Sequence, residues 1–158
     1  MTRTAQEERE RLFIEEMGLF YESFGVPRMS GKLLGHLLIC EPPVQSSAQI
    51  IEALGASKGS VSTSTRMLIR MNLIDKVAVP GTRGSFFRIS PNAWTEALES
   101  KVTAISMFRR VMDHGLEVLA DSEPERRQRL LEARELYAYF ETEFPNLIER
   151  WKASREDQ

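Results

Sequence analysis

The sequence predicts a mainly α-helical protein with one small β-hairpin. Two observations lead to this fold class. Most of the chain repeats apolar residues three and four positions apart, the spacing of one helix face, whereas residues 75–89 alternate around a turn rich in Gly and Pro. With 158 residues and a hydrophobic fraction of 42%, the chain is long enough for one domain with helical extensions.

Two helices are predicted in the first quarter of the chain. The first covers residues 4–24 and ends at Gly25-Val26-Pro27. The second covers residues 30–40, where Gly35 indicates close packing of the backbone against another element. Residues 41–47, which contain two prolines, are expected to form a linker. The apolar face of the first helix consists of Phe13, Met17, Phe20 and Phe24.

Two further helices are predicted on either side of a tight turn. Ser46 stands three residues before Gln49, which is the spacing of a capping box at a helix start. Gly55-Ala56 forms the turn, and Ser57 is placed to cap the next helix. Asn72 lies where that helix should end in a left-handed residue.

The last part of the chain predicts a hairpin and two long helices. Residues 75–89 contain two strand-like runs, with Arg83 near the tip of the turn between them. The helices cover residues 91–120 and 123–155, and Pro145 should kink the second or start a new helix. Apolar residues recur in the second as a heptad seam: Leu130, Ala133, Tyr137, Phe140, Phe144, Leu147 and Trp151.

The helix over residues 57–71 divides into two unlike faces. Val61, Thr65 and Leu68 share the face expected to be buried. The opposite face carries small hydroxyl residues toward its start and two arginines one turn apart. Such a face suits the major groove of DNA, which admits a helix with little bulk and offers guanine edges to Arg.

This order of elements predicts a winged helix-turn-helix flanked by long dimerisation helices. The predicted regions are an N-terminal dimerisation helix (1–27), a DNA-binding domain (28–90) and a C-terminal helical dimerisation region (91–158). So many apolar residues on the outer helices would be exposed on a monomer, which favours a homodimer on a near-palindromic site. The candidate DNA-binding residues are Ser57, Lys58, Gly59, Ser60, Ser62, Thr63, Arg66, Arg70 and Arg83.

The distribution of charge supports this interpretation. The whole chain has a net charge of −2 and a pI near 5.8, which alone argues against a nucleic-acid-binding protein. Residues 28–90, however, hold eight Lys and Arg against three acidic residues. A basic middle between acidic flanks is expected when one region binds a polyanion.

The central sequence resembles the MarR superfamily of bacterial transcription regulators, and most closely its GbsR-type branch. The resemblance is carried by "RMSGKLLGHLL", by "SSAQIIEALGASKGSVSTSTRML" and by "PGTRGSFFRI". One departure is Asn72, where the family commonly has Gly. The resemblance implies a transcriptional regulator, a ligand-responsive repressor that binds double-stranded DNA as a homodimer.

The resemblance also implies a small-molecule effector, because some relatives sense ligands that include quaternary amines. Aromatic rings attract such cations. Phe20, Phe24 and Trp94 are the candidates for an effector site. The alternative is that these aromatic residues belong to the core and the dimer interface.

Other classes of protein find little support in the sequence. No apolar run is long enough for a membrane span, no signal peptide is present, and the single Cys40 excludes an internal disulfide framework, so a cytoplasmic protein is expected. Cys40 is expected to be a structural helix-end residue or, alternatively, a redox sensor. No metal site is predicted, because His36 and His114 have no Cys or acidic partner at ligand spacing. The sequence also contains no motif typical of an enzyme, and no cofactor is predicted. The remaining alternative is a winged-helix protein-interaction module without DNA binding.

Overall fold

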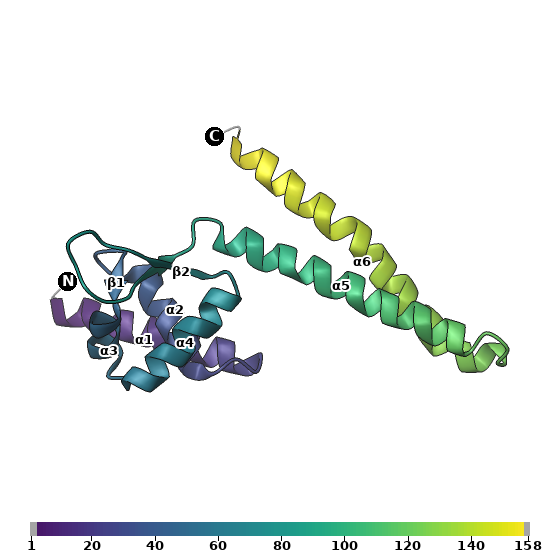
Figure 1. Ribbon diagram of the computed structural model, residues 1–158, viewed down its shortest axis with the longest axis horizontal. Coiled ribbons are helices and arrows are strands. Elements are labelled where there is room, and N and C mark those ends of the chain that lie inside the picture. Colours follow the sequence, from purple (N-terminus) through teal and green to yellow (C-terminus); the bar gives the residue numbers. More distant parts are fainter. Residues whose placement is uncertain (1–2, 157–158) are drawn as a thin grey trace. The chain divides into compact units, whose positions relative to one another are not determined.

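The computed structural model describes residues 3–156, so the outermost residues of the predicted terminal regions, 1–2 and 157–158, lie outside it. The chain folds into two compact units, one ending at Ala93 and the other beginning at Trp94 (Figure 1). The fold class predicted from the sequence, mainly helical with a small antiparallel sheet, is confirmed. In chain order the elements are α1 (Arg3–Ser23), α2 (Arg28–Ile39), β1 (Gln45–Ser46), α3 (Ser47–Leu54), α4 (Lys58–Arg70), β2 (Ile74–Val77), β3 (Phe86–Ile89), α5 (Ala93–Val118) and α6 (Pro124–Glu156).

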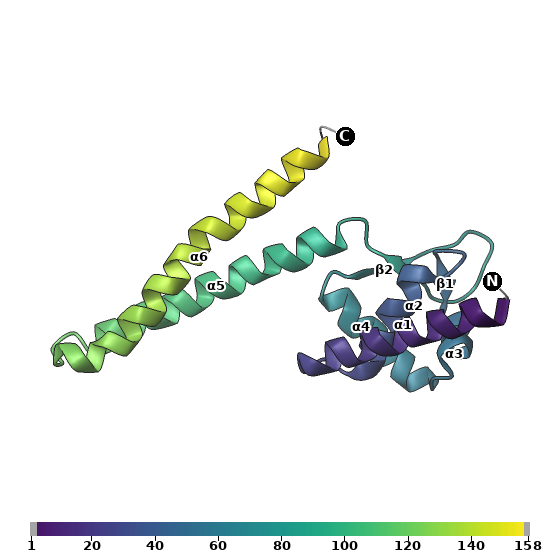
Figure 2. The same ribbon diagram turned by 180° about the vertical axis from the view of Figure 1, so that it is seen from behind.

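Helices α2, α3 and α4 enclose the core of the first unit. Leu33 and Leu34 of α2, Ile50 of α3 and Leu68 of α4 are completely buried. Helix α1 packs along α2, and the two lie side by side in both views (Figures 1 and 2). Glycines permit this close approach: a Cβ atom on Gly35 would lie 2.9 Å from Cβ of Met17, which confirms the packing expected there.

The helix ends follow the predicted capping residues. The Ser46 hydroxyl accepts a hydrogen bond from the Gln49 amide, and the Gln49 side chain accepts one from the Ser46 amide, so the capping box is confirmed. Asn72 adopts a φ of 57°, which confirms the left-handed residue expected after α4. Asn tolerates this conformation better than other non-glycine residues do.

The sheet contains a third strand that the sequence did not reveal. Its order is β1-β3-β2, and both pairs are antiparallel. The segment predicted as a linker, 41–47, therefore includes a strand, and that prediction is wrong for Gln45 and Ser46. A two-residue strand carries no alternation, and its partner, Phe86–Ile89, lies about forty positions away along the chain.

The second unit is a pair of long helices. The chain turns after α5 and returns as α6, and the helices separate with distance from that turn (Figures 1 and 2). Between the middle parts of the two helices, the ring centroids of Phe108 and Tyr137 lie 4.1 Å apart, and Arg109 pairs with Asp113 and Glu141. Helix α6 continues through Pro145, so of the two outcomes expected there, the start of a new helix is wrong and a kink stays a prediction.

Candidate DNA-binding surface

Helix α4 is fixed to the first unit by its cap and its buried face. The Ser60 amide donates to the Ser57 hydroxyl over 3.1 Å, so Ser57 caps the helix. Val61, Thr65 and Leu68 are buried, as the helical period predicts. Because one face is held in the core, the orientation of the opposite face is fixed.

The outward face of α4 carries exposed hydroxyls and guanidinium groups. Ser62, Thr63, Arg66 and Arg70 are all exposed. The Ser62 carbonyl accepts from Nε of Arg66 over 3.3 Å, a bond that does not use the terminal nitrogens of the guanidinium. Exposed guanidinium and hydroxyl groups are the donors that read base edges and contact phosphates in a major groove. The remaining predicted residues of this region, Lys58 and Gly59, are exposed and Ser60 is half-buried.

The wing presents Arg83 at an exposed turn. Gly81 and Gly84, on either side of it, have φ values of 78° and 123°, which residues with a side chain rarely adopt. The Thr82 hydroxyl and amide both donate to the Val79 carbonyl, over 2.7 and 3.2 Å. The turn is therefore held by backbone geometry and leaves Arg83 at the tip.

A groove of about 570 Å³ lies between α3, α4 and the sheet. Its cationic side chains are Lys58 and Arg66 from α4 and Lys76 from β2, and its lining contains no carboxylate. Sequence reasoning missed Lys76 as a site residue. The available signal was its alternation with buried Ile74, which places both on one face of the strand. Hydroxyl residues complete the polar part of the lining: Ser47, Ser62, Thr65 and Ser85.

Ion pairing separates the basic residues of 28–90 into two groups. Arg28 and Lys32 pair with Glu15 of α1 over 2.8 and 2.6 Å, and these two cations lower the pKa of the Glu15 carboxyl. Arg88 lies 3.6 Å from Asp75. The other five make no ion pair with any carboxylate of residues 4–155, and all lie on α4, β2 or the wing: Lys58, Arg66, Arg70, Lys76 and Arg83.

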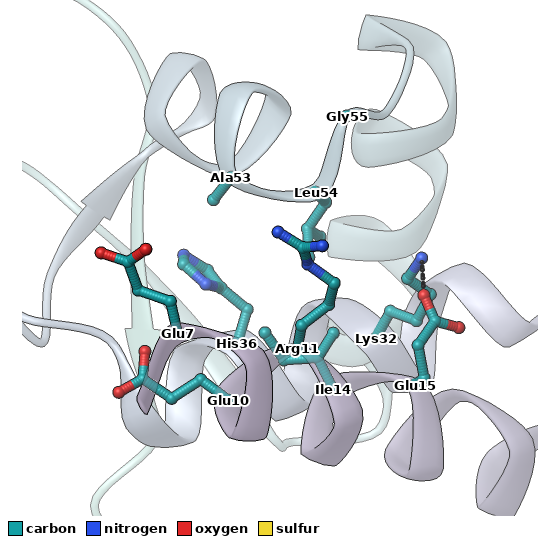
Figure 3. A pocket seen from close by; sticks show the side chains of 10 residues that line it. All are labelled: Glu7, Glu10, Arg11, Ile14, Glu15, Lys32, His36, Ala53, Leu54 and Gly55. Atoms are coloured by element: carbon teal, nitrogen blue, oxygen red, sulfur yellow. Dashed lines mark ion pairs between the residues drawn. The ribbon is translucent and has the colours of Figure 1, made fainter. Parts of the chain in front are cut away.

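A second hollow, of about 410 Å³, lies between α1, α2 and α3 (Figure 3). Both signs of charge line it, and Figure 3 shows Arg11 extending from α1 toward Leu54. His36 faces it half-buried; burial lowers the pKa of this imidazole, and a hydrogen bond with Gln45 opposes that shift. Within the described part of the chain, no group of three His, Cys, Asp or Glu side chains is placed to hold a metal ion.

The predicted effector residues and Cys40 are distributed over both units. The Phe20 and Phe24 rings meet edge to face, with centroids 5.0 Å apart, and both side chains are exposed. Trp94 belongs to the second unit, where it lines an apolar hollow of about 460 Å³ with Leu98, Phe144, Leu147, Ile148 and Trp151. Cys40 follows α2, and its partial burial raises the pKa of the thiol.

These elements define a winged helix-turn-helix protein, and comparison with known proteins identifies its family. Residues 92–155 match the family model of MmpR5-like MarR family transcriptional regulators. The chain is 40% identical over 139 residues to the HTH-type transcriptional regulator MmpR5 of Mycobacterium tuberculosis, which covers 88% of this chain and 84% of that protein. A crystal structure described as that of a transcriptional regulator has a TM-score of 0.81 and 39% identity, covering 92% of this chain and 99% of that one.

The chain belongs to the MarR family of transcriptional regulators, as its central motifs predicted. Proteins of this family bind DNA and are not enzymes. In the part that the structure describes, no helix is long and apolar enough to cross a membrane.

Proposed function

We propose that this protein binds double-stranded DNA sequence-specifically, with α4 in the major groove and the wing beside the minor groove. One observation carries the proposal: within residues 28–90, the five basic residues that have no carboxylate partner among residues 4–155 all lie on α4, β2 and the wing. A duplex is a dense line of negative charge, so unpaired cations on one surface favour its binding. The residues proposed to contact DNA are Ser57, Lys58, Gly59, Ser60, Ser62, Thr63, Arg66, Arg70 and Arg83.

The regulator acts as a homodimer in this proposal. Helices α5 and α6 expose large apolar side chains, among them Met107 at 60%, Val111 at 61% and Tyr139 at 62%. Burial of such side chains against a second copy is favourable. A two-fold dimer places its recognition helices about 34 Å apart, one turn of B-DNA, so the operator is a near-palindrome. Light scattering at micromolar concentration should give twice the 18.1 kDa of one chain, and a stable 18.1 kDa species would contradict the dimer.

Several finer features complete the proposal. The protein represses transcription, because a dimer covering an operator within a promoter blocks the polymerase, and it works in the cytoplasm, where the bacterial chromosome lies. A small-molecule effector, with Phe20, Phe24 and Trp94 as its candidate contacts, stays a prediction. Membership of the GbsR-type branch also stays a prediction, since the family model that matches is the MmpR5-like one.

Enrichment of bound duplexes from a random pool tests the proposal. A sequence-specific dimer should enrich two inverted half-sites whose centres lie about one helical turn apart. A winged-helix module that serves only protein contacts should enrich no sequence. The variant Arg66→Ala/Arg70→Ala is the control, because it keeps the buried face of α4 and should lose the enrichment.

A further inference from the structure

Lys76 occupies a position where a strand of this sheet would normally carry an apolar residue. It lies on β2 opposite Phe87 of β3, and the register places Ile74 opposite Ile89 two residues earlier. Ile74 and Phe87 are buried, at 1% and 5% exposure, whereas Lys76 is exposed. The face of the sheet that packs on the core therefore ends in Lys76, which lines the groove.

The neighbouring acidic residue faces the other side of the strand. Asp75 lies opposite Arg88 in the register and is 3.6 Å from its guanidinium. The Ser90 hydroxyl donates to the same carboxylate over 2.6 Å. Successive side chains of a strand point to opposite faces, so Asp75 is held away from the groove that Lys76 enters. One face of the sheet thus carries the Asp75–Arg88 ion pair. The other face carries Lys76, which has no carboxylate partner among residues 4–155.

The start of α3, which lines the groove, is hydrogen-bonded to the segment that leads into β3. Both the amide and the hydroxyl of Ser47, the first residue of α3, donate to the Ser85 carbonyl, over 2.9 and 3.3 Å. These bonds fix the start of α3 to the chain just before β3. Lys76, Lys58 and Arg66 line this same groove, together with Ser47 and Ser85.

We propose that Lys76 binds a phosphate of the DNA strand that passes between α4 and the wing. This inference rests on the proposed function and adds a contact outside the recognition helix and the tip of the wing. When α4 lies in the major groove and the wing beside the minor groove, the sugar-phosphate strand that divides those grooves crosses the space between them. Lys76, with no described carboxylate partner, supplies the compact point charge that suits a phosphate.

The salt dependence of binding tests this contact. Each phosphate contact contributes about 0.9 to the slope of log affinity against log salt concentration. The factor by which one contact raises the affinity therefore falls about 3.5-fold between about 50 and about 200 mM salt. Lys76→Gln should reduce the slope by about 0.9 for each subunit bound, equally on operator and scrambled duplexes. Lys76→Arg should restore the slope. The matched control is Arg88→Gln, which removes the same charge from the other face of the same strand pair and should change the slope little.

Two outcomes would overturn the inference while leaving the proposed function standing. One is a salt slope in Lys76→Gln equal to that of the wild-type protein. The other is an equal decrease of the slope in Lys76→Gln and Arg88→Gln, because that result would mean that only the net charge of the protein matters. A wild-type protein that binds no duplex at low salt would overturn the proposed function itself. Thermal midpoints of the variants should match that of wild type, because neither side chain is buried.

Discussion

Replacing Arg66 with alanine isolates the reading of bases by α4. The side chain is exposed, and its hydrogen bond within the described residues is the 3.3 Å bond to the Ser62 carbonyl of the same helix. Alanine has the higher helix propensity, which offsets the loss of that bond. We therefore expect the free energy of unfolding to change by less than about 0.5 kcal/mol.

Arg66→Ala should instead lower the affinity of the protein for the operator. A guanidinium that donates two hydrogen bonds to a guanine edge contributes about 1–3 kcal/mol, so affinity should fall about 5- to 150-fold for each half-site. Arg66→Lys is the matched control. It keeps the charge and loses the planar pair of donors, so it should retain affinity for scrambled duplexes while losing preference for the operator.

Fluorescence anisotropy with operator and scrambled duplexes at one salt concentration measures both effects. Wild-type affinity for the operator in Arg66→Ala would remove this residue from the contacts. An equal loss on both duplexes would show that Arg66 contacts only phosphates, and the reasoning from the exposed face of α4 to base readout would fail.

Gly31, Arg83 and His36 each allow a further test in the first unit. Gly31→Ala should destabilise the unit by about 1–3 kcal/mol or more, because its Cβ would lie 2.9 Å from Cβ of Tyr21 and collide with the Met17 carbonyl. Gly59→Ala is the control and should be neutral or stabilising, because its Cβ would point into open space. Urea unfolding of the two variants compares their free energies of unfolding. Arg83→Ala should weaken binding to operator and scrambled duplexes alike with an unchanged thermal midpoint; equal affinity in wild type and variant, measured by titration, would place the wing off the DNA. Burial lowers the pKa of His36 in the folded protein, so the unfolded chain binds the proton more readily and stability should fall as pH drops from about 6.5 toward the lowered value. Urea midpoints across that range should show a smaller decrease in His36→Gln than in wild type, and identical pH profiles would exclude His36 as the cause.

Local patterns were sufficient to predict α4 and its caps. The buried positions Val61, Thr65 and Leu68 follow from the period of a single helix, and the bonds of Ser46 and Ser57 join residues three apart. Interactions of this range depend on neighbouring residues alone, so the sequence displays them directly. The family motifs lie in the same region for the same reason.

Contacts between distant segments were not predictable from the same patterns. Pairing of β1 with β3 joins Gln45 to Phe87, and no periodicity marks a strand of two residues. Residues 28–90 contain eight basic residues, but the sequence does not show which of them form ion pairs. The packing of α1 on α2 shows that Glu15 neutralises two of them. Lys76 becomes a site residue only when the register of the sheet places it in the groove.

Titration of the wild-type protein against its enriched operator over a range of salt concentrations tests the central claim most directly. A sequence-specific dimer should bind the operator at least about a thousandfold more tightly than a scrambled duplex, and both affinities should decrease steeply and linearly in log salt. Equal affinity for the two duplexes, or no binding of either at about 50 mM salt, would contradict the assignment of α4 and the wing as a DNA-reading surface.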